Sequence, residues 1–260
     1  MATFNRPRIA ATSDLHYVRN SKGLWKDLFL YASENADVLA ICGDLTDYGL
    51  PEEAQVLAED LRAHCHIPVV AVFGNHDFES GAIGEVTKIL EGAGVHLLDG
   101  ECAEIQNVGF VGVRGFGGGF GSRMLAAWGE PATKHFVQES VDQALHLERA
   151  LARLETTYRI ALLHYSPIRD TIVGENPEIF PFLGSTRLEG PLNRFKVDAA
   201  FHGHAHNGTH EGATSTGIPV YNVAASLLRK HNPNHPPCMI YSPPQREEDE
   251  AAAEAGAVMI

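Results

Sequence analysis

Residues 38–47, VLAICGDLTD, carry the pattern that decides the fold. Val38–Ile41 is a short apolar run of the kind that forms a strand buried on both faces, and the polar loop Gly43–Asp47 follows closely. The same succession occurs on either side along the chain, as RIAATSDLH at residues 8–16 and VVAVFGNHD at residues 69–77. Each block therefore predicts a buried strand that ends in acidic, amide or imidazole side chains.

The pattern of strands and helices extends along most of the chain. Short apolar runs bounded by turn residues predict strands at Arg8–Thr12, Val38–Ile41, Val69–Phe73, Phe110–Val113, Arg159–Leu163, Ala199–Phe201 and Pro219–Val223. Helices are expected over Leu24–Asn35, Glu52–His64, Val86–Glu91 and Glu139–Thr156. The last carries an approximate apolar stripe of Val141, Leu145, Leu147, Leu151 and Leu154. This alternation predicts an α/β sandwich with the sheet inside and the helices outside.

The length of 260 residues fits a single large α/β domain, which we expect over residues 1–242. Residues 243–260 change to an acidic, alanine-rich composition and are expected to form a disordered tail. Residues 170–195 contain three prolines and three glycines, which predicts a long loop with one short helix. Long loops in compact domains are often functional.

Composition and charge exclude several classes of protein. The net charge of -13, from 20 basic and 33 acidic residues, has the wrong sign for binding nucleic acid or anionic lipid through the overall field. No apolar run approaches the roughly 20 residues of a membrane span. The N-terminus lacks a signal pattern, so we expect a cytoplasmic protein. The four cysteines form no CxxC pair, which argues against a zinc knuckle or a disulfide scaffold.

Histidines indicate where the chemistry lies, because five of the 14 closely follow predicted strands. In an open α/β sheet the carboxyl ends of the strands form the ligand-binding edge, so these polar loops are expected to share one site. The candidate metal ligands are Asp14, His16, Asp44, Asn75, His164, His204 and His206. Oxygen and imidazole ligands without sulfur suit manganese, iron or zinc. Seven ligands exceed the needs of one tetrahedral ion and suit a pair.

Five sequence blocks together resemble the calcineurin-like metallophosphoesterase superfamily. Its motifs D-x-H, G-D-x-x-D, G-N-H-D/E, H and G-H-x-H occur here in order, within residues 8–223. The resemblance implies a four-layer αββα sandwich that hydrolyses a phosphoester by attack of a metal-bound hydroxide. It also implies two ligand sets, Asp14, His16 and His206 for one ion and Asn75, His164 and His204 for the other, with Asp44 bridging.

The same resemblance gives His76 the role of general acid at the leaving oxygen and Asp47 the role of orienting it. It implies two divalent or mixed-valence ions, with manganese expected and iron or zinc as alternatives. The substrate is expected to be a small-molecule phosphoester and a diester is favoured, although monoesters stay open. Protein phosphatase activity is not expected, because Tyr48 follows Asp47 where the phosphoprotein phosphatases have arginine.

Several residues near these motifs have two interpretations. Arg114 and Arg187 either contact a substrate phosphate or serve as structural, solvated arginines. His202 is either a donor behind the metal ligands or a core imidazole. Four phenylalanines in the nearby loops either wall an apolar pocket or pack the loops down: Phe116, Phe120, Phe180 and Phe182.

Two alternative functions come from other classes. The first is a catalytically weak, metal-binding interaction scaffold, which degraded ligands would indicate; all seven ligands and His76 are intact. The second is a small single-strand exonuclease, which salt-dependent binding to oligonucleotides would indicate. The oligomeric state cannot be read from the sequence.

Overall fold

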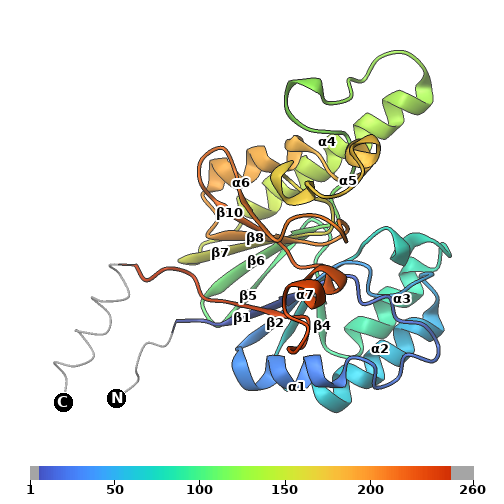
Figure 1. The fold of residues 1–260 in the computed structure, drawn as a ribbon, viewed down its shortest axis with the longest axis vertical. Helices are drawn as coiled ribbons and strands as arrows, with labels where there is room; N and C mark the ends of the chain where they lie inside the picture. The colour runs from blue at the N-terminus through green and yellow to red at the C-terminus, as the bar shows by residue number, and fades with distance from the viewer. Residues whose placement is uncertain (1–5, 247–260) are drawn as a thin grey trace.

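Two stacked sheets form the centre of the fold, and helices cover their outer faces (Figure 1). The structure is a computed structural model that describes residues 6–246. The first sheet has the strand order β11-β1-β2-β3-β4. Its strands are β1 (Ile9–Thr12), β2 (Val38–Cys42), β3 (Val69–Val72), β4 (Val95–Leu97) and β11 (Met239–Tyr241). β1 to β4 run parallel, and β11 pairs antiparallel with β1.

The second sheet has the order β5-β6-β7-β8-β10-β9. Its strands are β5 (Glu101–Ile105), β6 (Val108–Val113), β7 (Tyr158–Leu163), β8 (Ala199–His202), β9 (Glu211–Ala213) and β10 (Pro219–Asn222). The four inner strands are parallel, and both edge strands are antiparallel to their neighbours. Parallel inner strands place the carboxyl ends of each sheet along one edge.

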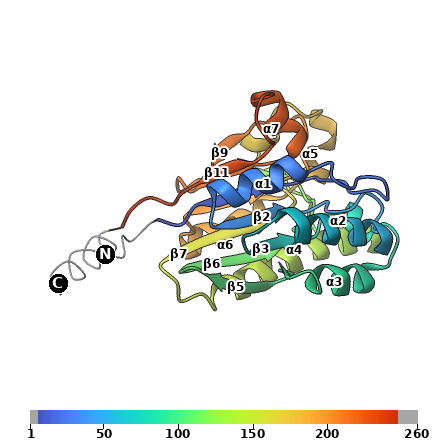
Figure 2. The same ribbon diagram turned by 90° about the horizontal axis from the view of Figure 1, so that it is seen from below.

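Helices cover each sheet on the side away from its partner (Figure 1), and Figure 2 looks onto the molecule from the side of the helices that cover the first sheet. The first sheet packs against α1 (Lys26–Asn35), α2 (Pro51–His64) and α3 (Ile83–Glu91). The second sheet packs against α4 (Pro131–Leu151) and α6 (Glu189–Phe195). Two further helices are α5 (Phe180–Leu183) and α7 (Ala225–His231). The expected four-layer sandwich is therefore confirmed.

The continuous apolar strands have a physical reason in this layering. In β2, Val38, Ala40 and Cys42 face the core between the sheets. Leu39 and Ile41 of the same strand pack against the helix layer. Because both faces of a central strand are buried, an unbroken apolar run replaces the polar alternation of a half-exposed strand.

All seven predicted strands are present, but the sequence analysis missed four strands at or near sheet edges, β4, β5, β9 and β11. The helix predicted over Glu139–Thr156 is α4, which begins earlier, at Pro131, and also ends earlier, at Leu151. Leu145 is 41% exposed and therefore lies outside the apolar stripe in which it was placed. Residues 170–195 are not one long loop. They contain the 3-10 turns η3 (Asp170–Ile172), η4 (Pro177–Ile179) and η5 (Thr186–Leu188) together with α5 and α6.

The predicted boundary after residue 242 remains a prediction, because residues 247–260 of the predicted tail lie outside the described residues. Within the described part, Arg246 forms an ion pair with Asp198 at 2.7 Å, so contacts with the sandwich continue to that residue. Among residues 6–246, every helix is too short or too polar to cross a lipid bilayer.

Candidate metal centre

Loops from both sheets meet at one edge of the sandwich. The backbone nitrogens of Asp14 and His16 each bond a carbonyl of the loop after β2, Gly43 and Asp44 respectively, at 3.0 Å. The backbone nitrogen of His76, after β3, bonds the Asp44 carboxylate at 2.9 Å. From the second sheet, the backbone nitrogen of His204 bonds the Asp14 carboxylate at 3.1 Å. These bonds connect the first sheet's loops to the loop after β8.

Three glycines permit this close approach of the loops. A Cβ on Gly43 would overlap the His164 imidazole, and one on Gly74 would overlap the Asp44 carboxylate. A Cβ on Gly203 would overlap Ser13 and Asp14. Glycine is required at these motif positions because another loop of the site occupies the space of its missing side chain.

Backbone strain is concentrated in the same loops. Asp14, His16, Asp44 and His204 have positive φ angles of 59°, 46°, 48° and 68°. Non-glycine residues rarely adopt this left-handed conformation, and it tends to persist at functional sites where the surrounding structure enforces it.

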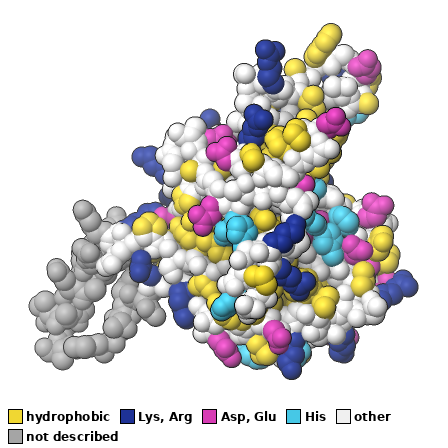
Figure 3. Space-filling view, viewed as in Figure 1, with side chains coloured by type: hydrophobic (Ala, Val, Ile, Leu, Met, Phe, Trp, Pro, Cys, Tyr) yellow, Lys and Arg dark blue, Asp and Glu magenta, His cyan; other side chains and the backbone are white. Residues whose placement is uncertain are grey.

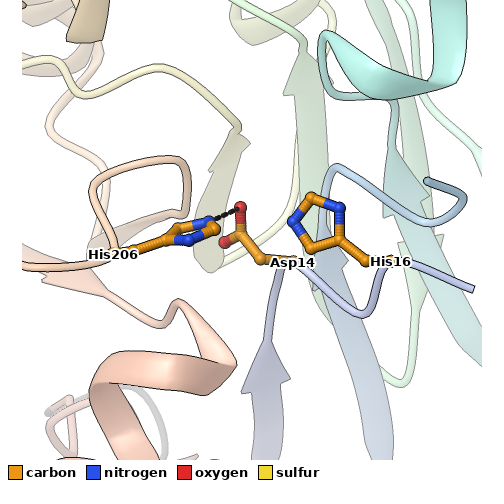
Figure 4. Close-up of side chains that lie close together, drawn as sticks. All are labelled: Asp14, His16 and His206. Atoms are coloured by element: carbon orange, nitrogen blue, oxygen red, sulfur yellow. Dashed lines mark hydrogen bonds and ion pairs between the residues drawn. The ribbon is translucent and has the colours of Figure 1, made fainter. Parts of the chain in front are cut away.

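One group of potential ligands consists of Asp14, His16 and His206, whose ligand atoms lie within 4.8 Å of one another. Figure 4 shows the Asp14 carboxylate between the two imidazoles. Nε2 of His206 lies 2.9 Å from an Asp14 oxygen. This group brings the ends of β1 and β8 together.

A second, more buried group consists of Asp44, His164 and His204. Nε2 of His164 lies 3.4 Å from Oδ1 of Asp44 and 3.0 Å from Oδ1 of Asn75. The other carboxylate oxygen of Asp44 lies 3.8 Å from Nε2 of His16, in the first group. The two oxygens of Asp44 therefore face the two groups. Figure 3 shows several exposed histidine side chains, in cyan, on the face of the molecule that is turned to the viewer in Figure 1.

A third group consists of His16, Asp47 and His76. The Asp47 carboxylate lies 3.0 Å from Nδ1 of His16 and 3.6 Å from Nδ1 of His76. The nearest acceptor to His76 is instead the backbone carbonyl of Asp47, 2.7 Å from Nδ1. Asp47 thus contacts two histidines, and its carbonyl makes the shorter contact with His76.

Several imidazoles have one ring nitrogen bound outside the ligand groups. Nδ1 of His164 lies 2.9 Å from the Cys42 carbonyl, and Nε2 of His204 lies 3.2 Å from the Phe182 carbonyl. Because a carbonyl only accepts, each contact places the proton on that nitrogen of the neutral ring and leaves the other nitrogen available as a metal ligand. Such outer contacts are typical of metal-binding histidines.

Divalent cations fit this donor set. Nε2 of His16 is buried and has no hydrogen-bond partner within the described part of the chain, yet it faces the Asp44 carboxylate. The surrounding donors are carboxylates, imidazoles and one amide, a set that suits manganese, iron or zinc. Cations between these groups would satisfy the unpaired nitrogen and the convergent carboxylates together.

Electrostatics couples the carboxylates to the imidazoles. Burial opposes ionisation of Asp44, but the charge and hydrogen bond of His164 outweigh it and hold the Asp44 pKa well below its usual range. Burial also opposes the charged form of His164, yet Asp44 and Asp14 raise its pKa to about 9. Burial, with the charge of His164 second, lowers the pKa of His204 to about 4. The hydrogen bond to Asp14 raises the pKa of His206.

The two predicted arginines lie in different surroundings. The Arg114 guanidinium bonds Glu139 at 2.9 Å and lies 4.6 Å from the Phe78 ring centroid. Arg187 bonds the Leu125 carbonyl at 2.7 Å. Its Nη1 is buried without a partner among the described residues. Arg114 is therefore already paired with a carboxylate, whereas we find no carboxylate partner for Arg187 in the described part.

Asp77 is a part of the site that we did not predict from the sequence. This buried carboxylate accepts bonds from the backbone nitrogens of Gly74, Leu45 and Thr46 and from the Thr46 hydroxyl, at 2.6–3.2 Å. It therefore fastens the loop after β3 to the loop after β2. Its position as the last residue of the G-N-H-D motif was the sequence feature from which a role in the site could have been predicted.

His202 is a buried core imidazole of β8. Nε2 lies 2.7 Å from the Thr171 hydroxyl and Nδ1 lies 2.8 Å from the Gly203 carbonyl. Burial lowers its pKa to about 4, so the ring is neutral at neutral pH. It supports the loop that carries His204 and His206 from behind.

Comparison with known families gives one match over most of the chain. A family model described as calcineurin-like phosphoesterase matches residues 7–208. A search of curated protein sequences finds no match.

Solved structures with the same fold come from several bacteria, and their low identities support similarity of fold alone. Phosphopantetheinyl hydrolase from Mycobacterium tuberculosis superposes with a TM-score of 0.64 at 16% identity, over 91% of this chain and 96% of its own. The protein TT1561 of Thermus thermophilus gives 0.55 at 16% identity, over 92% and 99%. A candidate 5′-nucleotidase from Staphylococcus aureus gives 0.54 at 13% identity, over 96% and 58%.

Proposed function

The chain belongs to the calcineurin-like phosphoesterase family, and from this premise we propose that it hydrolyses a small-molecule phosphodiester at a two-metal centre. The family makes the protein a metal-dependent phosphoester hydrolase. The preference for a diester, the identity of the ions and the roles of individual residues are our proposal.

The observation that carries the proposal is the position of Asp44. One oxygen of its carboxylate faces His164 at 3.4 Å, and the other faces His16 at 3.8 Å. This position supports a bridging role between two ions. Asp14, His16 and His206 would hold one ion, and Asn75, His164 and His204 the other. We propose manganese for both, with iron or zinc as alternatives.

When bound, a pair of divalent cations lowers the pKa of a water nucleophile and neutralises charge on the phosphoryl oxygens. The remaining chemistry belongs to the side chains. His76 is 41% exposed, whereas His164 is fully buried, so His76 is accessible to a substrate. Its Nδ1 faces the Asp47 carbonyl at 2.7 Å. Because that carbonyl can only accept, Nδ1 keeps its proton. Nε2 is therefore the nitrogen that would donate a proton to the leaving oxygen.

Asp47 has a positioning role in this proposal. Its carbonyl fixes the orientation of the His76 ring, and its carboxylate contacts Nδ1 of His16 at 3.0 Å. One residue thus orients both a proton donor and a ligand. A proton donor favours substrates whose leaving oxygen needs a proton, and among these we propose a diester.

We propose Arg187 as the side chain that contacts an anionic oxygen of the substrate. Burial lowers its pKa, and a substrate oxyanion would supply the counter-charge that we find in no described carboxylate. Arg114, which bonds Glu139 and contacts Phe78, would instead position the loops around His76.

The test compares two diesters of similar shape with manganese supplied, bis(p-nitrophenyl) phosphate and diphenyl phosphate. Phenol is the weaker acid, so its departure depends more on a proton donor. His76→Ala is expected to keep its metal content and to lower turnover about 10²- to 10⁴-fold. The loss should be larger with diphenyl phosphate.

Asp44→Asn separates metal binding from proton transfer, because it should lose the metal itself. His135→Ala, at an exposed histidine of α4, is the matched control and should behave as the wild type. Equal metal loss in the His76 and Asp44 variants would contradict the division of roles. Faster turnover of p-nitrophenyl phosphate than of the diester would contradict the preference for a diester.

A further inference from the structure

Phe182 is an exposed aromatic side chain whose backbone lies against the proposed metal centre. Its side chain is 57% exposed, while its carbonyl is 3.2 Å from Nε2 of His204. Neighbouring residues are fixed by backbone bonds to the loop after His164: Leu183 accepts from Ser166 at 3.0 Å, and Ser185 donates to Ser166 at 3.0 Å. The ring is therefore presented to solvent from a backbone that is held in place.

A row of aromatic rings connects Phe182 to the metal-ligand region. Ring centroids are 6.0 Å apart between Phe182 and Phe136, 4.9 Å between Phe136 and Phe116, and 5.7 Å between Phe116 and Tyr165. The Tyr165 ring lies 4.5 Å from that of His204. The inner rings are buried or half-buried and support the outermost one. The row thus runs from a proposed ligand to the surface.

The other phenylalanines of these loops have a different function. Phe120 and Phe180 are half-buried and pack against Ile172, Leu183 and Ala205. They hold the loops down, whereas Phe182 leaves most of its surface in water. A ligand that covers an exposed apolar ring removes apolar surface from water, which favours binding.

The arginine that contacts a ring of this row is already paired with a carboxylate, which favours an apolar ligand group beside the row, and Arg187, which we find without a carboxylate partner among the described residues, is assigned to the scissile phosphate. Arg114, whose guanidinium carbon lies 5.4 Å from the Phe116 ring centroid, is neutralised by Glu139. The chain as a whole carries a net charge of -13. A polyanionic substrate body would be repelled by this field, whereas a neutral aromatic group would not.

We propose that Phe182 determines specificity by stacking against a planar aromatic ring attached to the scissile phosphate. This inference rests on the proposed phosphoesterase function and narrows it to phosphoesters that carry an aromatic group. The ring could be that of an aryl alcohol or a nucleobase, which share the flat apolar face that a phenyl ring recognises.

Binding of non-hydrolysable phosphonates to the manganese-loaded protein tests the stacking without turnover. By calorimetry, phenylphosphonate is expected to bind about 10-fold more tightly than methylphosphonate. Cyclohexylphosphonate, with similar apolar bulk but no flat face, should fall between them. Phe182→Ala should abolish the preference for phenylphosphonate, and Phe182→Tyr should retain it.

Trp128→Ala is the matched control, because Trp128 is 78% exposed and takes part in none of the ring contacts that form the row. The control should keep the full preference. Two diesters distinguish an aryl alcohol from a nucleobase as the source of the ring. They are methyl phenyl phosphate and a nucleoside methyl phosphate. Their kcat/KM values should fall in Phe182→Ala mainly through a higher KM.

Two results would overturn the inference in different ways. A wild type that hydrolyses bis(p-nitrophenyl) phosphate but shows no preference for phenylphosphonate, or a preference that survives in Phe182→Ala, would overturn the role of Phe182 alone. A wild type that hydrolyses no phosphoester would overturn the proposed function and this inference with it.

Discussion

At the scale of single residues, charge and position explain the site better than residue type alone. Asp44 is 1% exposed and faces both ligand groups, and its charge contributes to the raised pKa of His164. A second carboxylate, Asp14, contacts His206 at 2.9 Å. Removing either negative charge therefore removes both a proposed metal contact and the partner of an imidazole.

The raised pKa of His164 predicts proton release when cations bind. After treatment with a chelator, His164 should carry a proton below its pKa of about 9. A protonated imidazole cannot bind a metal, so manganese affinity should rise with pH, by about 10-fold per unit from this residue up to that pKa. Calorimetric titration in buffers of different ionisation enthalpy measures the released proton. An affinity that does not change between pH 6 and 8 would contradict this prediction.

The sequence predicted the strand ends that carry the proposed ligands because D-x-H, G-D-x-x-D, G-N-H-D and G-H-x-H are local patterns. It could not predict contacts made through backbone carbonyls. The carbonyls of Cys42, Asp47 and Phe182 each contact a site histidine, and carbonyls are present at every residue. Only the folded arrangement distinguishes these three.

At the scale of elements, the site depends on how closely strand ends pack. Gly74 follows β3 and lies against the Asp44 carboxylate and backbone. Gly74→Ala should displace Asp44 and lower both manganese content and turnover, with a loss of about 10²-fold for a displacement near 1 Å. Elemental analysis and diester turnover measure the two effects.

Gly84→Ala controls for the loss of a glycine, because a Cβ on Gly84 of α3 meets nothing within 4 Å. Alanine also favours helix over glycine, so this variant should keep its activity and unfold at the same or a higher temperature. Normal metal content in Gly74→Ala would show that the loop after β2 can move away without cost, contrary to our account.

The elements that the sequence did not predict are strands with few buried residues and very short helices. β5 and β9 contain glutamates and have no fully buried residue, so neither stands out as an apolar run. Residues 170–195 form several turns of helix that are each three to seven residues long. Helices of this length have too few turns to show an apolar period and are stabilised by packing.

At the scale of the whole molecule, the proposed centre connects the two sheets. The ends of β1, β2 and β3 come from one sheet and those of β7 and β8 from the other. Cations that bind only the folded protein should therefore stabilise the sandwich by mass action.

Chelation is expected to lower the unfolding temperature. At free manganese about 100 times the dissociation constant, one ion contributes about 2.7 kcal/mol. For a chain of this size that corresponds to a decrease in Tm of roughly 5–10 °C on removal. Differential scanning calorimetry with and without EDTA measures it, and Asp44→Asn should show little response. A wild type whose Tm is insensitive to EDTA would argue against a cation centre between the sheets.

Anomalous diffraction from crystals grown with manganese tests the central claim most directly. Our account predicts two anomalous peaks on either side of the Asp44 carboxylate, one beside Asp14, His16 and His206 and the other beside Asn75, His164 and His204. A single peak, or peaks that leave Asp44 uncoordinated, would contradict it.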